Sequence, residues 1–408
     1  MKSIYLKVKY SGIAAIGLTM LAAVILLAGI AIPAQAQTET ILYSFQGSKD
    51  SGPDGAYPQV GPTLVGTTLY GTTWMGGSAG VGTAWAVSTT TGKETILHTF
   101  QGSPTDGWEP LGGLGYYKGS FYGTTIGAPC CYFGTIFEIT KSGKKYVETL
   151  LHEFSGPPDG YGPEYVTPVF DSQGNLYGTT YVGGEPGNGT VFKMSPGGTE
   201  TVIHNFNCNS DGCYPESGVT LDKKGNLYGT AAGGGSTACG YGCGVLYEIT
   251  AAGNYSILYS FLGGNDGFAP YAPPVLDKKG NLYGTTENGG SGLYGTVYKF
   301  NPKTGQKTIL HNFSGESDGA SPWAGALVFD KAGNLYGTTL GGGIDGMCGT
   351  IYKIAPDGSN YTILYKFGCD PDGGQPGGGV VFDKSGNLYT TTSVGGAYNY
   401  GAVIKLTP

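Results

Sequence analysis

Gly333-Asn334-Leu335-Tyr336-Gly337-Thr338-Thr339 is one of seven versions of a short phrase that recurs along this chain. The other versions are centred on Tyr70, Tyr122, Tyr177, Tyr228, Tyr283 and Tyr389. Successive tyrosines are 52, 55, 51, 55, 53 and 53 residues apart. A repeat of that length indicates a solenoid, a propeller or another array of similar units.

A second phrase, Asp-Gly-x-x-Pro, follows the same period. Its seven copies begin at Asp54, Asp106, Asp159, Asp211, Asp266, Asp318 and Asp372. Each copy lies in a segment between two apolar runs, where Asp and Gly are typical turn residues. The chain is therefore read as seven similar units.

The composition fits a folded all-β protein. Glycine makes up 77 of 408 residues and only 12% of residues are charged, but 31 tyrosines and 16 phenylalanines supply apolar surface to bury. The net charge is −7, without a basic cluster in the repeats. This argues against nucleic-acid binding, which needs positive charge to neutralise phosphates.

The first 36 residues resemble a secretory signal peptide. Lys2, Lys7 and Lys9 precede an apolar run over residues 13–32, and Ala34-Gln35-Ala36 gives a small-x-small cleavage pattern. The alternative is an uncleaved membrane anchor, because the run is nearly long enough to span a bilayer. We expect cleavage, after which no contact with the membrane is expected.

Each unit is expected to contain four strands, called a to d. Around Tyr336 they are residues 326–330, 334–339, 350–354 and 361–367, rich in β-branched and aromatic residues. Short Gly-containing segments join a to b and c to d, as in antiparallel hairpins. Seven such units predict an all-β seven-bladed β-propeller over residues 37–408, with four antiparallel strands per blade.

The two ends of the repeat region indicate how the ring closes. Ile41-Leu42-Tyr43-Ser44-Phe45 matches strand d, whereas residues 401–406 match strand c. The last blade therefore lacks its outer strand, and the N-terminal outer strand is expected to complete it and cover the open sheet edge. An open solenoid would need atypical capping repeats, which the sequence does not show.

Gly337 follows the repeated tyrosine on strand b. A glycine in a strand often marks a close approach, and we expect it to leave room for aromatic side chains of the neighbouring blade. In the last unit Thr390 takes this place.

Long loops are expected on one face only, between d and a and between b and c. That face is the candidate binding surface, since binding residues favour loops on a rigid scaffold. Six aromatic residues in or just after the Asp-Gly-x-x-Pro segments are ligand-binding candidates: Tyr57, Trp108, Tyr161, Tyr214, Phe268 and Trp323. Such rings suit stacking on sugars or apolar side chains. The alternative is that they only pack between blades.

The repeated polar residues are read as framework. The Asp of Asp-Gly-x-x-Pro can accept hydrogen bonds from loop N–H groups. Calcium binding is an alternative at Asp370-x-Asp372, but the full calcium-loop spacing is absent, so no metal or other cofactor is expected. His98, His152, His204 and His311 share one strand-d position with tyrosines of the other units, which argues against a catalytic role.

The best enzymatic case rests on three carboxylates. Glu109, Glu164 and Glu216 fall at or just after the motif prolines of three consecutive units. They would serve as weak catalytic candidates if they faced one another, as the acid pair of a glycosidase must. The alternative is that they are solvated loop residues.

Eight cysteines in an exported chain indicate disulfides. Cys348 and Cys369 are expected to lie opposite each other across a c–d hairpin and to form a bond. The pairing of Cys208, Cys213, Cys239 and Cys243 stays open among three possibilities, with local pairs the simplest. Cys130 and Cys131 form a vicinal bridge or stay unpaired. A zinc site is disfavoured because these loops contain no histidine.

Taken together, these phrases resemble one known family. Asp-x-x-Gly-Asn-Leu-Tyr-Gly-Thr-Thr, Gly-Thr-Val-Phe-Lys, Ile-Leu-His-x-Phe and Asp-Gly-x-x-Pro are similar to the choice-of-anchor tandem repeat proteins of the GloVer type, the Gloeobacter/Verrucomicrobia repeat. Copies here include residues 330–342, 189–193, 309–313 and 318–322, and the resemblance covers residues 41–408. It implies an exported bacterial protein without an established activity, often with a C-terminal anchoring segment. No such segment follows the last strand here, so a secreted or periplasmic protein is expected.

The sequence therefore favours an exported, monomeric, non-enzymatic propeller that binds a glycan or a protein through its long-loop face. The alternative is a polysaccharide hydrolase or lyase that uses the carboxylates. The fold alone does not decide between them, because propellers carry many functions.

Overall fold

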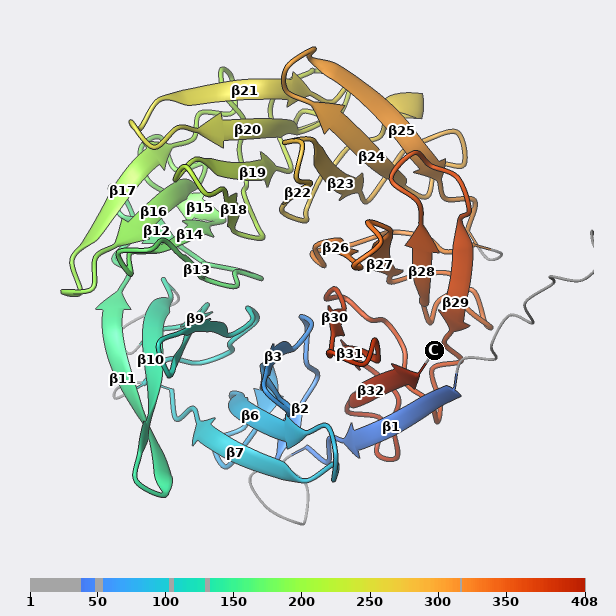
Figure 1. Ribbon diagram of the computed structural model, residues 1–408. Helices are drawn as coiled ribbons and strands as arrows, with labels where there is room; N and C mark the ends of the chain where they lie inside the picture. Colours follow the sequence, from blue (N-terminus) through green and yellow to red (C-terminus); the bar gives the residue numbers. More distant parts are fainter. Residues whose placement is uncertain (1–37, 48–53, 103–105, 129–132, 316–317, 408) are drawn as a thin grey trace, which may run out of the picture. The chain divides into compact units, whose positions relative to one another are not determined.

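The computed structural model describes residues 38–47, 54–102, 106–128, 133–315 and 318–407. The segment expected to be a signal peptide, and Cys130 and Cys131, lie outside these residues. Within them, Thr38–Thr407 forms a single compact unit. Its strands form seven four-stranded antiparallel sheets arranged as the blades of a propeller (Figure 1).

Each blade runs from strand a, nearest the centre of the ring, to strand d at its edge (Figure 1). Blade 1 contains β3 (Thr63–Val65), β4 (Thr68–Thr73), β6 (Thr83–Ser88) and β7 (Glu94–Thr99). Blade 2 contains β8 (Gly115–Tyr117), β9 (Ser120–Thr125), β10 (Thr135–Ser142) and β11 (Lys145–Glu153). Blade 3 contains β13 (Val169–Phe170), β14 (Leu176–Thr180), β16 (Thr190–Met194) and β17 (Glu200–Asn205). Blade 4 contains β18 (Val219–Leu221), β19 (Leu227–Ala231), β20 (Val245–Ile249) and β21 (Tyr255–Ser260).

The remaining blades follow the same order. Blade 5 contains β22 (Val275–Leu276), β23 (Leu282–Thr286), β24 (Thr296–Asn301) and β25 (Gln306–Asn312). Blade 6 contains β26 (Val328–Phe329), β27 (Leu335–Thr339), β28 (Thr350–Ile354) and β29 (Thr362–Lys366). Blade 7 contains β30 (Val381–Phe382), β31 (Leu388–Thr392), β32 (Ala402–Thr407) and β1 (Thr38–Ser44). Two short ribbons, β2 (Gly55–Ala56) with β5 (Met75–Gly76) and β12 (Gly160–Tyr161) with β15 (Val182–Gly183), and one 3₁₀ turn (Gly264–Asp266) lie in the loops.

The seven-bladed fold and its predicted closure are confirmed. β1 pairs antiparallel with β32, from Thr38 opposite Thr407 to Ser44 opposite Ala402 (Figure 1). This pairing satisfies the outer edge of β32, which would otherwise expose a row of unpaired backbone groups.

The core between blades is a stack of aromatic side chains. The phenylalanines that follow or end strand d are all buried: Phe45, Phe100, Phe154, Phe206, Phe261, Phe313 and Phe367. Phe313 meets the ring of Tyr352, on strand c of the next blade, edge to face at 5.3 Å between ring centroids. Edge-to-face pairs of this kind add to the free energy gained from burial.

The strand-b glycine serves this stack differently from our expectation. A Cβ on Gly337 would lie 2.5 Å from the Tyr352 hydroxyl and 2.8 Å from Leu327, both in its own blade. The expectation that Gly337 leaves room for aromatic side chains of the neighbouring blade is therefore wrong. Tyr352 of the same blade covers Gly337, and Tyr352 in turn contacts Phe313 of blade 5. In blade 7 both residues of this pair differ: Thr390 takes the place of the glycine, and Ile404, which lies opposite it, takes the place of the tyrosine.

The Asp-x-x-Gly-Asn-Leu-Tyr part of the repeat builds the a–b turn. Asp330 Oδ1 accepts the backbone N–H of Asn334 at 2.8 Å, and Oδ2 accepts its side-chain amide at 2.7 Å and the Tyr336 hydroxyl at 3.2 Å. A carboxylate that binds its own downstream backbone fixes a tight turn. These residues are thus committed to structure.

Candidate functional site

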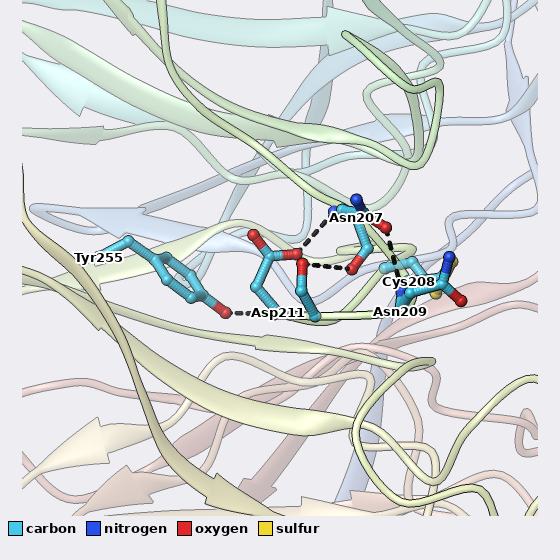
Figure 2. The surroundings of a disulfide bond; sticks show 7 residues. Asn207, Cys208, Asn209, Asp211 and Tyr255 are labelled. Carbon is cyan, nitrogen blue, oxygen red and sulfur yellow. Dashed lines mark hydrogen bonds between the residues drawn. A yellow bond between two sulfur atoms is a disulfide. The ribbon is translucent and has the colours of Figure 1, made fainter.

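The seven Asp-Gly-x-x-Pro segments form seven equivalent junctions between adjacent blades. Each motif Asp contacts the polar aromatic residue of the preceding strand d at 2.7 to 3.2 Å. The pairs are Tyr43–Asp54, His98–Asp106, His152–Asp159, His204–Asp211, Tyr259–Asp266, His311–Asp318 and Tyr365–Asp372. The same carboxylates accept loop N–H groups, as Asp211 does from Asn207 at 2.6 Å (Figure 2).

The backbone of the motif ties the blades together. The residue before the proline has a positive φ of 52 to 65° in all seven copies, as at Tyr57, Glu109 and Tyr214. Its N–H donates to the b–c loop of the preceding blade and its carbonyl accepts from its own b–c loop; Tyr214 pairs in this way with Asn188 and Ala232. The motif therefore recurs because it connects blades, which explains its presence without a ligand.

Three of the six predicted aromatic residues lie within the framework. Tyr57 packs edge to face on Tyr400 at 5.5 Å, and Tyr161 packs on Phe133 at 5.2 Å. Trp108 covers Gly127 so closely that a Cβ there would overlap the indole.

The other three aromatic residues meet around blades 4 to 6. Tyr214 and Phe268 line a cleft of 640 Å³, together with Tyr181, Tyr241 and Tyr271. Trp323 packs on Tyr271 at 4.4 Å between ring centroids. We call this hollow the blade-4 cleft; its further lining residues are Val182, Glu216, Ala232, Gly233, Cys239, Gly240, Gly242, Ala269 and Asn288.

The cleft exists because the residue after strand b differs from blade to blade. Blade 3 has Tyr181 there and blade 5 has Glu287, but blade 4 has Ala232, whose small side chain leaves the space between them open. Tyr241 is 84% exposed at the rim. Sequence reasoning missed Tyr181, Tyr241, Tyr271 and Glu287, although the variable position after each Leu-Tyr-Gly-Thr was a visible signal for two of them.

One carboxyl group, that of Glu216, lines the cleft, and two more lie near it. Burial, with Glu164 and Glu287 nearby, raises the pKa of Glu216 to about 8. Burial also raises the pKa of Glu164 and of Glu287. Glu216 Oε2 is buried with no hydrogen-bond partner among the described residues. Of the predicted carboxylates, Glu164 thus acts on Glu216, and the second carboxyl that does so is Glu287 rather than Glu109.

Aromatic side chains also cover the centre of the ring. Tyr165 lines the central cavity of 280 Å³, which is bounded by strand-a and loop residues such as Val60, Val219 and Val380. Its ring lies 6.0 Å from that of Trp323, edge to face. The blade-4 cleft and the central cavity are therefore separated by a short row of rings, Tyr165, Trp323 and Tyr271.

A larger cavity, of 850 Å³, is elsewhere. It lies between the a–b turns of blades 3 and 4, lined by Phe170, Tyr177, Lys193 and the two turn aspartates Asp171 and Asp222. Both aspartates accept hydrogen bonds from the backbone of their own turns. Because its polar groups are already used in this way, we regard it as a groove of the framework.

Disulfides brace the loops around the cleft. Cys208 bonds Cys213, next to Tyr214, and Cys239 bonds Cys243, on either side of Tyr241. Figure 2 shows the first bridge beside Asp211, whose backbone carbonyl accepts the Tyr255 hydroxyl. Cys348 and Cys369, expected to face each other, are bonded with Cα atoms 5.1 Å apart. Disulfides are typical of exported proteins. No helix within the described residues is long and apolar enough to cross a membrane.

A family model of the Gloeobacter/Verrucomicrobia repeat matches residues 30–241 and 236–408. The chain belongs to this family. The match spans every blade of this Gloeobacter/Verrucomicrobia repeat protein and confirms the resemblance seen in its motifs. A search of curated proteins found no match.

Solved structures of low identity share the propeller. An oligogalacturonate lyase from Vibrio parahaemolyticus is 14% identical, with a TM-score of 0.54, over 92% of this chain and 94% of that one. An oligogalacturonate lyase in complex with manganese is also 14% identical, with a TM-score of 0.53, over 91% and 97% of the two chains. At this identity the likeness concerns the fold of the Gloeobacter/Verrucomicrobia repeat protein alone.

Proposed function

We propose that this protein is an exported, non-enzymatic propeller that binds a neutral glycan in the blade-4 cleft. The observation that carries the proposal is the combination of aromatic walls with the buried carboxyl group of Glu216 in a hollow of 640 Å³. Ligand pockets for small molecules occupy roughly 300–1,000 Å³. The cleft is thus large enough for one or two sugar units.

The tyrosines of the cleft offer apolar surfaces on which a sugar ring can stack. Tyr181 and Tyr214 lie 5.1 Å apart with their planes tilted by 33°, and Tyr241 is exposed at the rim. Tyrosine combines a flat apolar face with a polar edge. Sugar rings have apolar faces of their own, so these side chains can stack on them while their hydroxyls bind the sugar's polar edge.

Glu216 and Asn288 offer polar contacts to a sugar. Because the pKa of Glu216 is raised to about 8, its carboxyl is largely protonated at neutral pH. A protonated carboxyl both donates and accepts hydrogen bonds. The buried, unpartnered Oε2 is therefore suited to a sugar hydroxyl, and the Asn288 amide, which already donates to Glu287 at 2.7 Å, has a second N–H to offer.

The charge of the cleft favours a neutral glycan over an acidic one. Its lining residues contain no lysine, and the chain has no arginine at all. A uronate would bring negative charge into a cleft near Glu164 and Glu287 without a cation to compensate it, which is unfavourable. Binding of oligogalacturonate, named for the structural neighbours, is for this reason not proposed here.

A hydrolase is the second candidate, because Glu216 resembles the acid of a glycosidase. Such an enzyme needs one protonated and one ionised carboxyl on either side of the scissile bond. Glu216, with its raised pKa, could serve as the acid and Glu164 or Glu287 as its partner. A lyase acting on uronates is disfavoured by the lack of positive charge, since the developing enolate needs stabilisation.

The test is a panel of neutral and acidic polysaccharides, scored for binding and for release of reducing ends. The proposal expects binding of a neutral glycan without turnover, reduced at least tenfold in Tyr271→Ala. Turnover that disappears in Glu216→Gln with binding retained would establish the hydrolase instead. Binding of acidic glycans alone would contradict the charge argument. We further expect the secreted or periplasmic form to begin near Gln37, which N-terminal sequencing of exported protein checks.

A further inference from the structure

Each junction between blades contains a third side chain that varies more than the first two. It comes from strand d of the following blade, four residues before that strand's own His or Tyr. The seven residues at this place are Glu39, Glu94, Glu148, Glu200, Tyr255, Lys307 and Tyr361. Together with the Asp and the His or Tyr, they give junctions of four different compositions.

Where the third residue is Lys or Tyr, it contacts the Asp or the His of the junction directly. Lys307 Nζ lies 2.7 Å from Asp266 Oδ1, and this lysine side chain is only 3% exposed. Tyr255 stacks flat on His204 at 3.9 Å between ring centroids, as Tyr361 does on another histidine. The Lys307 junction shows that this place in the fold accepts a buried positive charge beside the motif Asp.

Where the third residue is Glu and the first is His, the junction has ligands but no lysine. His98, Asp106 and Glu148 form one such group, and each offers a ligand atom within 4.8 Å of the other two. Glu148 Oε1 is buried and has no hydrogen-bond partner among the described residues. The His98 side chain is 22% exposed, which leaves solvent a way in.

The same arrangement occurs once more, between blades 2 and 3. His152, Asp159 and Glu200 again place their ligand atoms within 4.8 Å, and Glu200 Oε1 is again buried without a partner. The histidine is exposed to the same extent, 22%. Glu39 and Glu94 also have such an oxygen at the junctions with tyrosine, so the histidine is what distinguishes these two junctions. Two copies of one three-ligand geometry call for a common explanation.

We propose that His98–Asp106–Glu148 and His152–Asp159–Glu200 each bind one divalent transition-metal ion. One imidazole and two carboxylates are ligands that Zn²⁺ and Mn²⁺ accept, with the fourth position open to water. The imidazole selects against Ca²⁺ and Mg²⁺, which prefer oxygen ligands. The ion brings positive charge to the motif Asp, as Lys307 Nζ does at its own junction, and it joins two neighbouring blades.

Binding replaces one hydrogen bond with metal bonds. The Nε2 atom of His98 lies 2.7 Å from Asp106 Oδ2 and must offer a lone pair to the ion, so its proton moves to Nδ1. Any proton held by Glu148 is released to solvent. Zn²⁺ binding should therefore release protons, and the measured heat should depend on the buffer.

The first test is isothermal titration of the metal-free mature protein with ZnCl₂, repeated with CaCl₂. The proposal expects two Zn²⁺ per chain, one for each group of three, and no Ca²⁺ binding at the same sites. Absence of Zn²⁺ binding at 0.1 mM would overturn it and leave a proton shared between the two carboxyls as the occupant. Four Zn²⁺ per chain would also overturn it, because all four His–Asp pairs would then bind without a glutamate.

The second test introduces a residue, tyrosine, that already occupies the equivalent position in two other junctions. Glu148→Tyr copies the composition of the Tyr255 junction and should fold; with Glu200→Tyr it should abolish Zn²⁺ binding, and each single variant should keep one ion. Glu94→Tyr, at the Tyr43–Asp54 junction that lacks histidine, is the matched control and should leave two. Zn²⁺ should raise the Tm of the parent and of Glu94→Tyr by the same amount, raise that of Glu148→Tyr and of Glu200→Tyr by less, and leave that of the double variant unchanged. Two ions retained in the double variant would contradict the proposal.

Discussion

The seven junctions and the blade-4 cleft are made from the same loops, yet the junction residues recur from blade to blade whereas the cleft residues differ. At the junctions, the Asp and the backbone before the proline keep the same contacts in every blade. At the cleft, Ala232 stands where its neighbours have Tyr181 and Glu287, and two disulfides brace the surrounding loops. In this propeller, repeated residues are structural, and the candidate binding site appears where the repeat is broken.

Removal of β1 should have the largest effect on the repeated framework. Deleting residues 38–45 exposes the edge of β32 and removes the buried Phe45 together with the partly buried Ile41 and Leu42. At roughly 1.5–3 kcal/mol for a fully buried apolar side chain, the loss is about 4 kcal/mol or more. Thermal unfolding measures it, and an unchanged Tm would show that ring closure does not stabilise the fold.

Substitution of the strand-b glycine is expected to come next. Gly337→Val places methyl groups against Tyr352 and should cost about 3 kcal/mol, because a well-packed core resists added volume. Blade 7 supplies a matched rescue, since Thr390 lies opposite Ile404 there. Gly337→Thr with Tyr352→Ile should therefore be more stable than the sum of the two single variants predicts. Simple additivity in urea unfolding would refute the pairing.

A pH-dependent effect is expected from the carboxyl group of Glu216 in the cleft. The pKa of Glu216 is about 8 in the folded protein and 4.5 in a model compound, so the folded state favours its protonated form. That contribution to stability is complete below pH 4.5 and is lost as the pH rises toward 8. The free energy of unfolding of Glu216→Gln should therefore rise by up to about 3 kcal/mol relative to that of the parent between pH 5 and pH 8, since one pKa unit corresponds to about 1.4 kcal/mol.

Urea unfolding of both proteins at the two pH values measures this gain. Glu109→Gln is the control, because Glu109 is not among the charged groups that act on Glu216. Equal pH dependence in the parent and Glu216→Gln would mean that this carboxyl titrates as if it were exposed to water.

The sequence was sufficient for the framework because each repeated residue type has one physical task that returns in every blade. The period of the tyrosines, the unmatched strand at each end and the hairpin across Cys348 and Cys369 depend on local chemistry and simple counting. The packing of Gly337 was predicted less well, since strand alternation shows that a ring must be near but not which strand supplies it.

The cleft was harder to predict because it results from a difference between units. Tyr181, Ala232 and Tyr271 are far apart in the sequence, and only the ring brings them around one hollow. Tyr271 directly follows its motif proline, as the predicted Trp323 does, so it carried the same signal and was overlooked. Tyr57 and Tyr161 carry the same chemical signal as Tyr214, yet their neighbours Tyr400 and Phe133 fill the space that a ligand would need.

The most direct test of the central claim compares two tyrosines that the sequence alone treats alike. Affinity for the neutral glycan found in the polysaccharide panel is measured by titration calorimetry for the parent, Tyr214→Ala and Tyr57→Ala, after thermal unfolding has shown that each variant is folded. Loss of a stacking ring should weaken binding at least tenfold, which is about 1.4 kcal/mol, in Tyr214→Ala, and less than about twofold in Tyr57→Ala. Equal losses in the two variants, or a loss in Tyr57→Ala alone, would contradict the account.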